Sequence, residues 1–264
     1  MILQLRDKLR HLFLSYGECL IPESSSKEGE VRCLYGHHLF DDQVDGFERA
    51  IRELKALGDF ISLDELIGAL DGSNEVKGRN FFLSFDDAFL GVFENALPVL
   101  KQQDVPAAVF VPTAFPGTKD EDLEAFRKEA GYSRKVRFPD WSTIRAASGA
   151  GFEIGSHTRT HARLSGLEPW ELESEILGSK KEIEDRIGKE CRAISWPYGT
   201  EGDVSETALN LVRGAGYSVC FSAIRGSVNG DYRDHFRIPR EHVEFDWPLS
   251  HIRFFARGLG DYLP

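Results

Sequence analysis

The sequence predicts an α/β protein built as one barrel-like domain. Short apolar segments typical of buried strands recur from residue 31 to residue 239, and most are separated by segments with the apolar spacing of amphipathic helices. Such alternation predicts parallel strands in one sheet, with the helices as crossovers. Seven or eight units favour a closed barrel over an open sheet, although the pattern alone permits both. The chain of 264 residues is long enough for one such barrel.

Each element is predicted from its own local pattern. Ser62 and Glu65 form a capping box in front of the apolar LIGAL segment, and Gly188 follows another helical segment, as is common at helix ends. The predicted strands are 31–35, 59–61, 80–85, 107–111, 152–154, 192–196, 217–221 and 236–239. The predicted helices are 44–57, the LIGAL segment, 89–103, 141–149, 168–187 and 203–215.

The remaining segments set the domain organisation. Residues 1–30 are predicted as an N-terminal extension with a short amphipathic helix and a polar loop, and residues 31–264 as a single barrel domain. No internal repeat or linker divides the chain. The long charged segment 112–140 lies between two predicted strands, where it is either a lid or substrate-selecting loop, or a solvated excursion.

The composition excludes several partners and compartments. Lys and Arg number 32 against 43 Asp and Glu, a net charge of −11, and we therefore expect no nucleic-acid partner, because binding phosphates requires clustered positive charge. Charges interrupt every short apolar run near the N-terminus, which predicts no signal peptide, no transmembrane segment and a cytoplasmic protein. The four cysteines are far apart without a CxxC pair, which predicts buried free thiols.

Polar side chains follow four of the predicted strands. Asp86 and Asp87 come directly after an apolar strand, where adjacent carboxylates are costly unless something binds them. His157 and His161 follow another strand, at a spacing that places two imidazoles on one face of a helical turn. Two imidazoles and one carboxylate leave open positions on a divalent ion, as in a catalytic site. A solvated turn for the aspartates and a surface position for the histidines remain the alternatives.

Three motifs give the sequence a family resemblance. SFDDAF, SHTRTH and WPYG, in this order, resemble the polysaccharide deacetylase family, carbohydrate esterase family 4, and the resemblance covers about residues 31–240. It implies a distorted (β/α)7 TIM-like barrel. It also implies a hydrolase that removes N- or O-acetyl groups from a sugar, glycan or glycolipid precursor. The implied cofactor is a divalent metal ion, with zinc as the first candidate, and the implied partner is the carbohydrate or glycolipid substrate.

The resemblance assigns roles to the four central residues. The first aspartate of the family's TFDDG-type motif, here Asp86, is the catalytic base, and the second, Asp87, is a metal ligand. The H-S/T-x-x-H motif makes His157 and His161 the other two ligands. Such an arrangement suits amide hydrolysis, because an ion can acidify a water molecule while a carboxylate takes its proton.

The general acid and the partner of the base depart from the best-known family pattern. The usual C-terminal LxLH-like motif has no good match, and His251 is expected at the surface of a terminal helix. A branch that acts on exopolysaccharides carries a YHxV-like motif on its first strand. The LYGHHL segment resembles it, with a glycine in place of the tyrosine, and favours His37 as the acid, with His38 and His242 as alternatives. The other interpretation is that His37 and His38 only cap a loop near the site. Ser195 stands where the family's arginine would steady the base, so Arg240 is predicted to replace that arginine.

Two aromatic residues and two other functions complete the predictions. Trp196 and Tyr198 are predicted either to line the sugar groove or to be packed in the interior. One alternative function keeps the barrel but hydrolyses cyclic amides or imides. The other is a non-catalytic carbohydrate-binding relative. That second alternative is disfavoured by the retention of both a base and a ligand set, which binding alone does not need.

Overall fold

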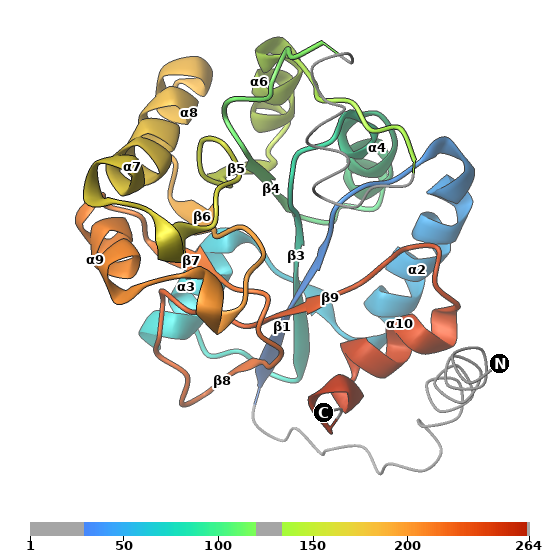
Figure 1. The fold of residues 1–264 in the computed structure, drawn as a ribbon. Coiled ribbons are helices and arrows are strands. Elements are labelled where there is room, and N and C mark those ends of the chain that lie inside the picture. Colours follow the sequence, from blue (N-terminus) through green and yellow to red (C-terminus); the bar gives the residue numbers. More distant parts are fainter. Residues whose placement is uncertain (1–28, 120–133, 263–264) are drawn as a thin grey trace, which may run out of the picture.

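A single curled sheet forms the centre of the fold (Figure 1). The computed structural model describes residues 29–119 and 134–262, and within them nine strands join this sheet in the order β7-β6-β5-β4-β3-β1-β8, with β2 beside β3 and β9 beside β1. The strands are β1 (Glu30–Gly36), β2 (Asp59–Phe60), β3 (Arg79–Phe85), β4 (Ala108–Val111), β5 (Glu153–Ser156), β6 (Ala193–Ser195), β7 (Val219–Phe221), β8 (Val228–Asn229) and β9 (Arg240–His242).

The two ends of this sheet approach each other, which gives the barrel its shape. Strands β1 and β3 to β7 run parallel, as does β9 beside β1, whereas the short β8 is antiparallel to the start of β1. A parallel bridge joins Phe221 to Ile238, just before β9. The sheet therefore curls back on itself. This architecture confirms the distorted (β/α)7 barrel.

Helices surround the curled sheet as crossovers between its strands (Figure 1). The buried residues Phe47, Ile51 and Leu54 share one face of α2, which explains its predicted extent, and the capping box of Ser62 and Glu65 opens α3. The helices are α2 (Val44–Leu57), α3 (Leu63–Asp71), α4 (Leu97–Gln102), α6 (Trp141–Gly149), α7 (Pro169–Glu173), α8 (Ser179–Ile187), α9 (Glu206–Gly214) and α10 (Leu249–Ala256).

Two of the predicted helices contain π-helical turns. The segment predicted at 89–103 has a π turn at Val92–Ala96 before α4, and the segment predicted at 168–187 has one at Ser174–Gly178 between α7 and α8. Such turns insert an extra residue into the helical repeat and are frequent at functional sites. The second of them supports the candidate site described below.

The barrel interior below the strand ends is packed with aromatic rings. Phe82 of β3 stacks on Phe221 of β7 with ring centroids 5.2 Å apart, and Phe110 of β4 lies against the same Phe221 at 5.3 Å. All three side chains are buried. The interior is thus a filled core, and the candidate site lies above it, at the C-terminal ends of the strands.

Some predictions are wrong in detail. The last strand, predicted at 236–239, is displaced to β9, because Pro239 has no N–H group for a ladder and only Ile238 makes a bridge before it. The two-residue strand β8 was not predicted at all. His251 lies on the terminal helix α10, as expected, but its side chain is buried, not at the surface.

Other predictions lie partly or wholly outside the described residues. The extension 1–30 is described only at its last two residues, where Glu30 already opens β1, and residues 120–133 of the charged segment 112–140 are likewise not described. Cys33, Cys191 and Cys220 are buried and free, as predicted, whereas Cys19 lies outside the description. No helix of the described parts of the chain has the length and apolar character needed to cross a membrane.

Candidate metal centre and catalytic site

The C-terminal ends of four strands and the start of a fifth converge on the candidate site. Its residues follow β1, β3, β5 and β6, except that Arg240 opens β9, and they surround a cavity of about 130 Å³. All eight side chains that the sequence analysis selected line this cavity: His37, Asp86, Asp87, His157, His161, Trp196, Tyr198 and Arg240. The fold therefore brings together residues that are up to 203 positions apart in the sequence.

Asp87, His157 and His161 form a compact cluster of potential metal ligands. Asp87 Oδ1 lies 3.6 Å from His157 Nε2 and 3.3 Å from His161 Nε2. Ligands bound at about 2.0–2.1 Å to one tetrahedral zinc ion are themselves roughly 3.3–3.5 Å apart, so the three atoms already have the spacing of a ligand set. The Asp87 and His157 side chains are buried and that of His161 is mostly buried.

The tautomer of His157 is set by a neighbouring strand. Its Nδ1 lies 2.8 Å from the backbone carbonyl oxygen of Ser195, an acceptor, so Nδ1 carries the proton and donates it. The lone pair of Nε2 then faces Asp87, as metal binding requires. Burial lowers the pKa of His157 to about 4, which keeps the imidazole neutral and available as a ligand at neutral pH.

Backbone strain is concentrated at the same strand ends. Six non-glycine residues of the described chain have a left-handed φ, and five of them belong to the loops of this site. Each such residue costs on the order of 1–3 kcal/mol and persists only where the surroundings enforce it. The five are Asp87, Ala88, Thr158, His161 and Tyr198. Two of the three potential ligands are thus held in place by a conformation that their own side chains disfavour.

Asp86 has a different set of neighbours from Asp87. Its two carboxylate oxygens accept hydrogen bonds of 2.8 and 2.7 Å from Nη1 and Nη2 of Arg240, and Ser195 Oγ lies 3.3 Å from one of them. Burial alone would raise the pKa of Asp86, but the Arg240 charge and its hydrogen bonds outweigh burial and hold that pKa below its ordinary range. Asp86 is therefore a carboxylate at neutral pH.

Arg240 is fixed from several sides. Its Nε donates to the backbone carbonyl of Ser222 at 2.6 Å, and its guanidinium also reaches the hydroxyls of Ser84 and Ser195. The side chain is 1% exposed, and the guanidinium lies over the ring of Tyr35 at 4.2 Å. A charge this deeply buried needs a paired counter-charge, and Asp86 is that partner.

The three histidines considered as the general acid occupy different places. His37 lines the cavity of the candidate site, whereas His38 lines a separate cavity and packs against Phe40 with ring centroids 4.5 Å apart. The ring centroid of His242 lies 5.2 Å from that of His37, and His242 Nε2 is 3.0 Å from Glu244 Oε1. Burial lowers the pKa of His37, and the carboxylates of Asp87 and Asp86 oppose that shift.

The two aromatic residues differ in exposure. Trp196 is 1% exposed and forms part of the cavity wall, so its ring faces are covered by packing. Tyr198 is 41% exposed at the cavity rim, with the guanidinium of Arg163 over its ring at 4.3 Å and the His161 ring 5.1 Å away. Of the two, Tyr198 presents a surface that a sugar ring can contact.

Glu175 supports the histidine loop and was missed by the sequence analysis. Its carboxylate accepts hydrogen bonds from the backbone N–H groups of Arg159 and Thr160, both at 2.8 Å, and from the Thr160 hydroxyl at 2.7 Å. It lies in the π turn Ser174–Gly178 and is buried. A signal exists in the sequence, because Glu175 falls between Leu172 and Ile176 on the buried face of the predicted helix.

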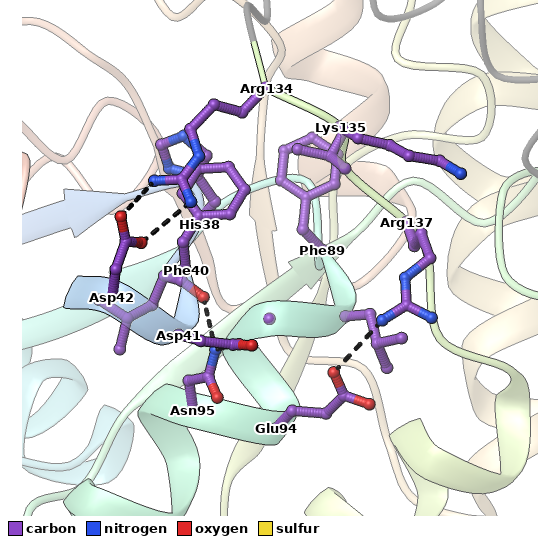
Figure 2. Close-up of a pocket in the computed structure, with 14 residues that line it drawn as sticks. His38, Phe40, Asp41, Asp42, Phe89, Glu94, Asn95, Arg134, Lys135 and Arg137 are labelled. Carbon is purple, nitrogen blue, oxygen red and sulfur yellow. Dashed lines mark hydrogen bonds and ion pairs between the residues drawn. The ribbon is translucent and has the colours of Figure 1, made fainter. Parts of the chain in front are cut away.

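A second cavity of about 430 Å³ lies beside the site, along the loops that follow β1 and β3 (Figure 2). Phe40 and Phe89 form aromatic parts of its wall, and Figure 2 shows Arg134 reaching across Phe40 to Asp42, with a 2.9 Å ion pair. A second ion pair joins Arg137 and Glu94. Aromatic side chains and ion-paired polar groups thus line this second cavity together with His38, the residue that follows His37.

Comparisons with known proteins identify the family of this chain. The family model for polysaccharide deacetylases matches residues 73–220, more than half of the chain. Poly-beta-1,6-N-acetyl-D-glucosamine N-deacetylase of Staphylococcus epidermidis is 27% identical over 209 residues, which cover 76% of this chain and 67% of the relative. YxkH of Bacillus subtilis, a protein assigned to the polysaccharide deacetylases, is 27% identical over 149 residues, 56% of this chain and 46% of YxkH.

A comparison with solved structures also finds a match over most of the chain. The structure of IcaB from Ammonifex degensii superposes with a TM-score of 0.71 at 21% identity, covering 88% of this chain and 98% of IcaB. The matched part of the chain spans about half to two thirds of the length of the two curated relatives. The family model covers both the aspartate and the histidine motifs of the site. The chain therefore belongs to the polysaccharide deacetylase family.

Proposed function

We propose that this protein is a metal-dependent hydrolase that removes N-acetyl, or O-acetyl, groups from a sugar, glycan or glycolipid precursor. The observation that carries the proposal is the division between two adjacent carboxylates. Asp87 faces two imidazoles, whereas Asp86 is held by Arg240 and kept ionised. The name of the Staphylococcus epidermidis relative supports an N-acetylated glucosamine polymer as the first substrate to test.

Asp87, His157 and His161 are the proposed ligands of a divalent ion, with zinc as the first candidate. Their donor set of two imidazole nitrogens and one carboxylate oxygen is that of catalytic zinc sites, and the proton on His157 Nδ1 leaves Nε2 free to bind. When bound, such an ion polarises the acetyl carbonyl and makes a water molecule more acidic.

Asp86 is the proposed general base. It lines the same cavity as the ligand set, and Arg240 orients both of its oxygens while keeping it unprotonated. It would accept the proton of the water that attacks the acetyl carbon. Arg240 and Ser195 hold the base by hydrogen bonds, and Arg240 does not itself exchange protons, because an arginine stays charged at neutral pH.

His37 is the proposed general acid, because it is the one histidine of the three candidates that lines the catalytic cavity. It would deliver a proton to the sugar nitrogen as the bond to the acetyl carbon breaks, which prevents the departure of an unstable amide anion. Tyr198 at the rim and the second cavity beside Phe40 are the proposed contacts for the sugar rings on either side of the cleaved group.

The proposal is tested by the product that the purified protein forms. We expect acetate release from N-acetylated glucosamine oligomers, with a smaller release from O-acetylated sugars. The same protein is assayed for ring opening of cyclic amides and imides, and for binding of the oligomers without turnover. Ring opening without acetate release would establish the alternative hydrolase, and binding without either product would establish a carbohydrate-binding protein.

A further inference from the structure

We propose that His37, His242 and Glu244 form a second metal site, weaker than the first, that takes a divalent cation such as zinc. These three side chains each offer a ligand atom, and the three atoms lie within 4.8 Å of one another. The described residues contain two groups of this kind, and the other is the proposed catalytic cluster of Asp87, His157 and His161.

The two groups have closely similar imidazole pairs. The His157 and His161 ring centroids are 5.0 Å apart with an angle of 68° between the ring planes. The His37 and His242 centroids are 5.2 Å apart with an angle of 64°. Each pair is accompanied by one carboxylate, Asp87 in the first group and Glu244 in the second. The second group thus repeats both the donor chemistry and the ring arrangement of the first.

Strand pairing explains why these residues meet. Parallel strands β1 and β9 place Tyr35 opposite His242, and side chains two positions apart on a strand share one face. His37 and Glu244 follow these two paired residues by two positions each, so both continue along the same side. Tyr35, His37 and His242 accordingly form a mutual contact, with centroids 5.2–5.5 Å apart.

Two ligand atoms of this group already face each other. His242 Nε2 is buried and forms an ion pair of 3.0 Å with Glu244 Oε1, although the pair lacks the geometry of a hydrogen bond. A cation between the imidazole and the carboxylate satisfies both, since neutral imidazole nitrogen and carboxylate oxygen are ordinary zinc ligands.

The second site is expected to be the weaker of the two. All three of its residues are only partly buried, and none has the left-handed backbone that fixes Asp87 and His161 in the first site. Glu244 Oε2 also lies 4.0 Å from His38 Nδ1, so a second histidine competes for the same carboxylate. Binding of a cation must therefore fix side chains that the fold does not already hold in place, and this ordering lowers the affinity.

A filled second site would stop catalysis, a consequence that rests on the function proposed above. The imidazole nitrogen that gives its electron pair to a metal ion cannot carry a proton to the leaving group. Zinc in excess of the first equivalent would thus remove His37 from the reaction without displacing the catalytic ion. Metal binding at this site stands independently of that consequence, because it depends only on the three ligands.

The binding claim is tested by calorimetric titration of the metal-free protein with zinc chloride. We expect two binding phases in the wild type. His242→Ala, and the nearly isosteric Glu244→Gln, should weaken the second phase at least about tenfold and keep the first. Asp87→Ala should lose the tight phase and keep the weaker one. Two unchanged phases in both His242→Ala and Glu244→Gln would overturn the site.

A control variant separates this site from other histidine–carboxylate contacts. His235 Nε2 lies 3.2 Å from Asp71 Oδ1, and the described chain supplies no third ligand there. His235→Ala should therefore retain both phases. Because calorimetry needs no turnover, its result stands even if no acetate is released.

Inhibition is measured separately, as acetate release at rising zinc concentration, each protein being compared with its own rate at one equivalent. The wild type should lose at least about tenfold in rate over the range that fills the second phase, and Glu244→Gln should keep most of its rate. Equal inhibition of both proteins would show that zinc does not act through this site.

Discussion

Asp86 and Asp87 show how two adjacent, identical side chains acquire different chemistry. Asp87 follows β3 with a left-handed backbone and faces His157 and His161, whereas Asp86 faces Arg240 and Ser195. The spacing of the aspartate and histidine motifs was visible in the sequence. Arg240 was less directly predictable as the partner of Asp86, because their contact depends on the pairing of β9 with β1 in the folded barrel.

Asp86→Asn tests the division between base and ligand. The amide cannot accept a proton, so acetate release should fall roughly 10²-fold or more, while bound metal remains. The variant also leaves the buried Arg240 without its counter-charge, so the free energy of unfolding should fall by about 3 kcal/mol. Metal analysis, kinetics and urea unfolding check the three parts. Loss of the metal would make Asp86 a ligand instead of the base.

Arg240→Met tests what Arg240 does for the base. Without the guanidinium, burial raises the pKa of Asp86, so the base stays protonated to a higher pH. The acidic limb of the kcat/KM profile should therefore move upward by about 1–3 pH units. A profile whose acidic limb does not move would show that Arg240 has no influence on the ionisation of the base.

His37→Ala tests the general acid through the leaving group. Turnover of an N-acetyl substrate should fall about 10²-fold or more, with a much smaller loss on an activated acetyl ester, whose leaving group departs without a proton. His38→Ala is the matched control, because His38 lies outside the catalytic cavity, and its amide-to-ester ratio should stay at the wild-type value. Equal losses on both substrates in His37→Ala would point to a positioning role.

At the scale of elements, the π turn Ser174–Gly178 connects a helix to the proposed metal centre. It carries Glu175, which holds the backbone between His157 and His161 through two N–H groups and one hydroxyl. Glu175→Ala should weaken zinc binding about 10–100-fold, because it removes all three hydrogen bonds that order the loop. Glu175→Gln, whose amide oxygen still accepts hydrogen bonds, should recover part of that affinity.

Glu173→Ala is the matched control for this loop, because Glu173 is an exposed carboxylate two residues earlier on the same helical segment. Its zinc affinity should equal that of the wild type in the same calorimetric titration. If Glu175→Ala also bound zinc with wild-type affinity, the loop would not need its buried carboxylate, and the proposed role of Glu175 in metal binding would be wrong.

The helices and strands show which features local sequence patterns can predict and which they cannot. Helix α2 was predicted to its last residue because its apolar spacing and its burial coincide. The π turns were not predictable, since a single extra residue hardly changes a 3.6-residue pattern, and Glu175 of the second turn finds its hydrogen-bond partners on a distant loop. The displaced last strand has a local cause in Pro239, but its pairing with β1 arises only when the barrel forms.

At the scale of the whole molecule, two buried charged residues of the barrel pair with more exposed charges of other segments. Asp261 accepts hydrogen bonds of 3.1 and 2.7 Å from Arg32 on β1, and Glu241 on β9 pairs with Arg225 at 3.2 Å. Burial raises the pKa of Glu241 from its ordinary value of 4.5 to about 7, and Arg225 only partly offsets the effect. The folded state therefore keeps this proton to a higher pH than the unfolded state does.

The sign of this linkage gives a prediction for stability. The protonated Glu241 makes its full contribution to the free energy of unfolding below about pH 4.5, and this contribution is lost as the pH rises to about 7. Glu241→Gln keeps the shape of the protonated acid without the titration. Urea unfolding from pH 4.5 to above 7 should thus show the wild type losing stability relative to Glu241→Gln. A constant difference between the two proteins across this range would exclude the effect.

The proposed metal centre can be tested directly. The central claim is that Asp87, His157 and His161 hold the ion on which acetate release depends. The measurement is the rate of acetate release from an N-acetylated glucosamine oligomer, as chelator-treated protein is titrated with zinc. The rate should be lost on chelation and return with the first equivalent in the wild type, but not in Asp87→Ala. Undiminished release by the metal-free protein, or full recovery of Asp87→Ala at one equivalent, would contradict the claim.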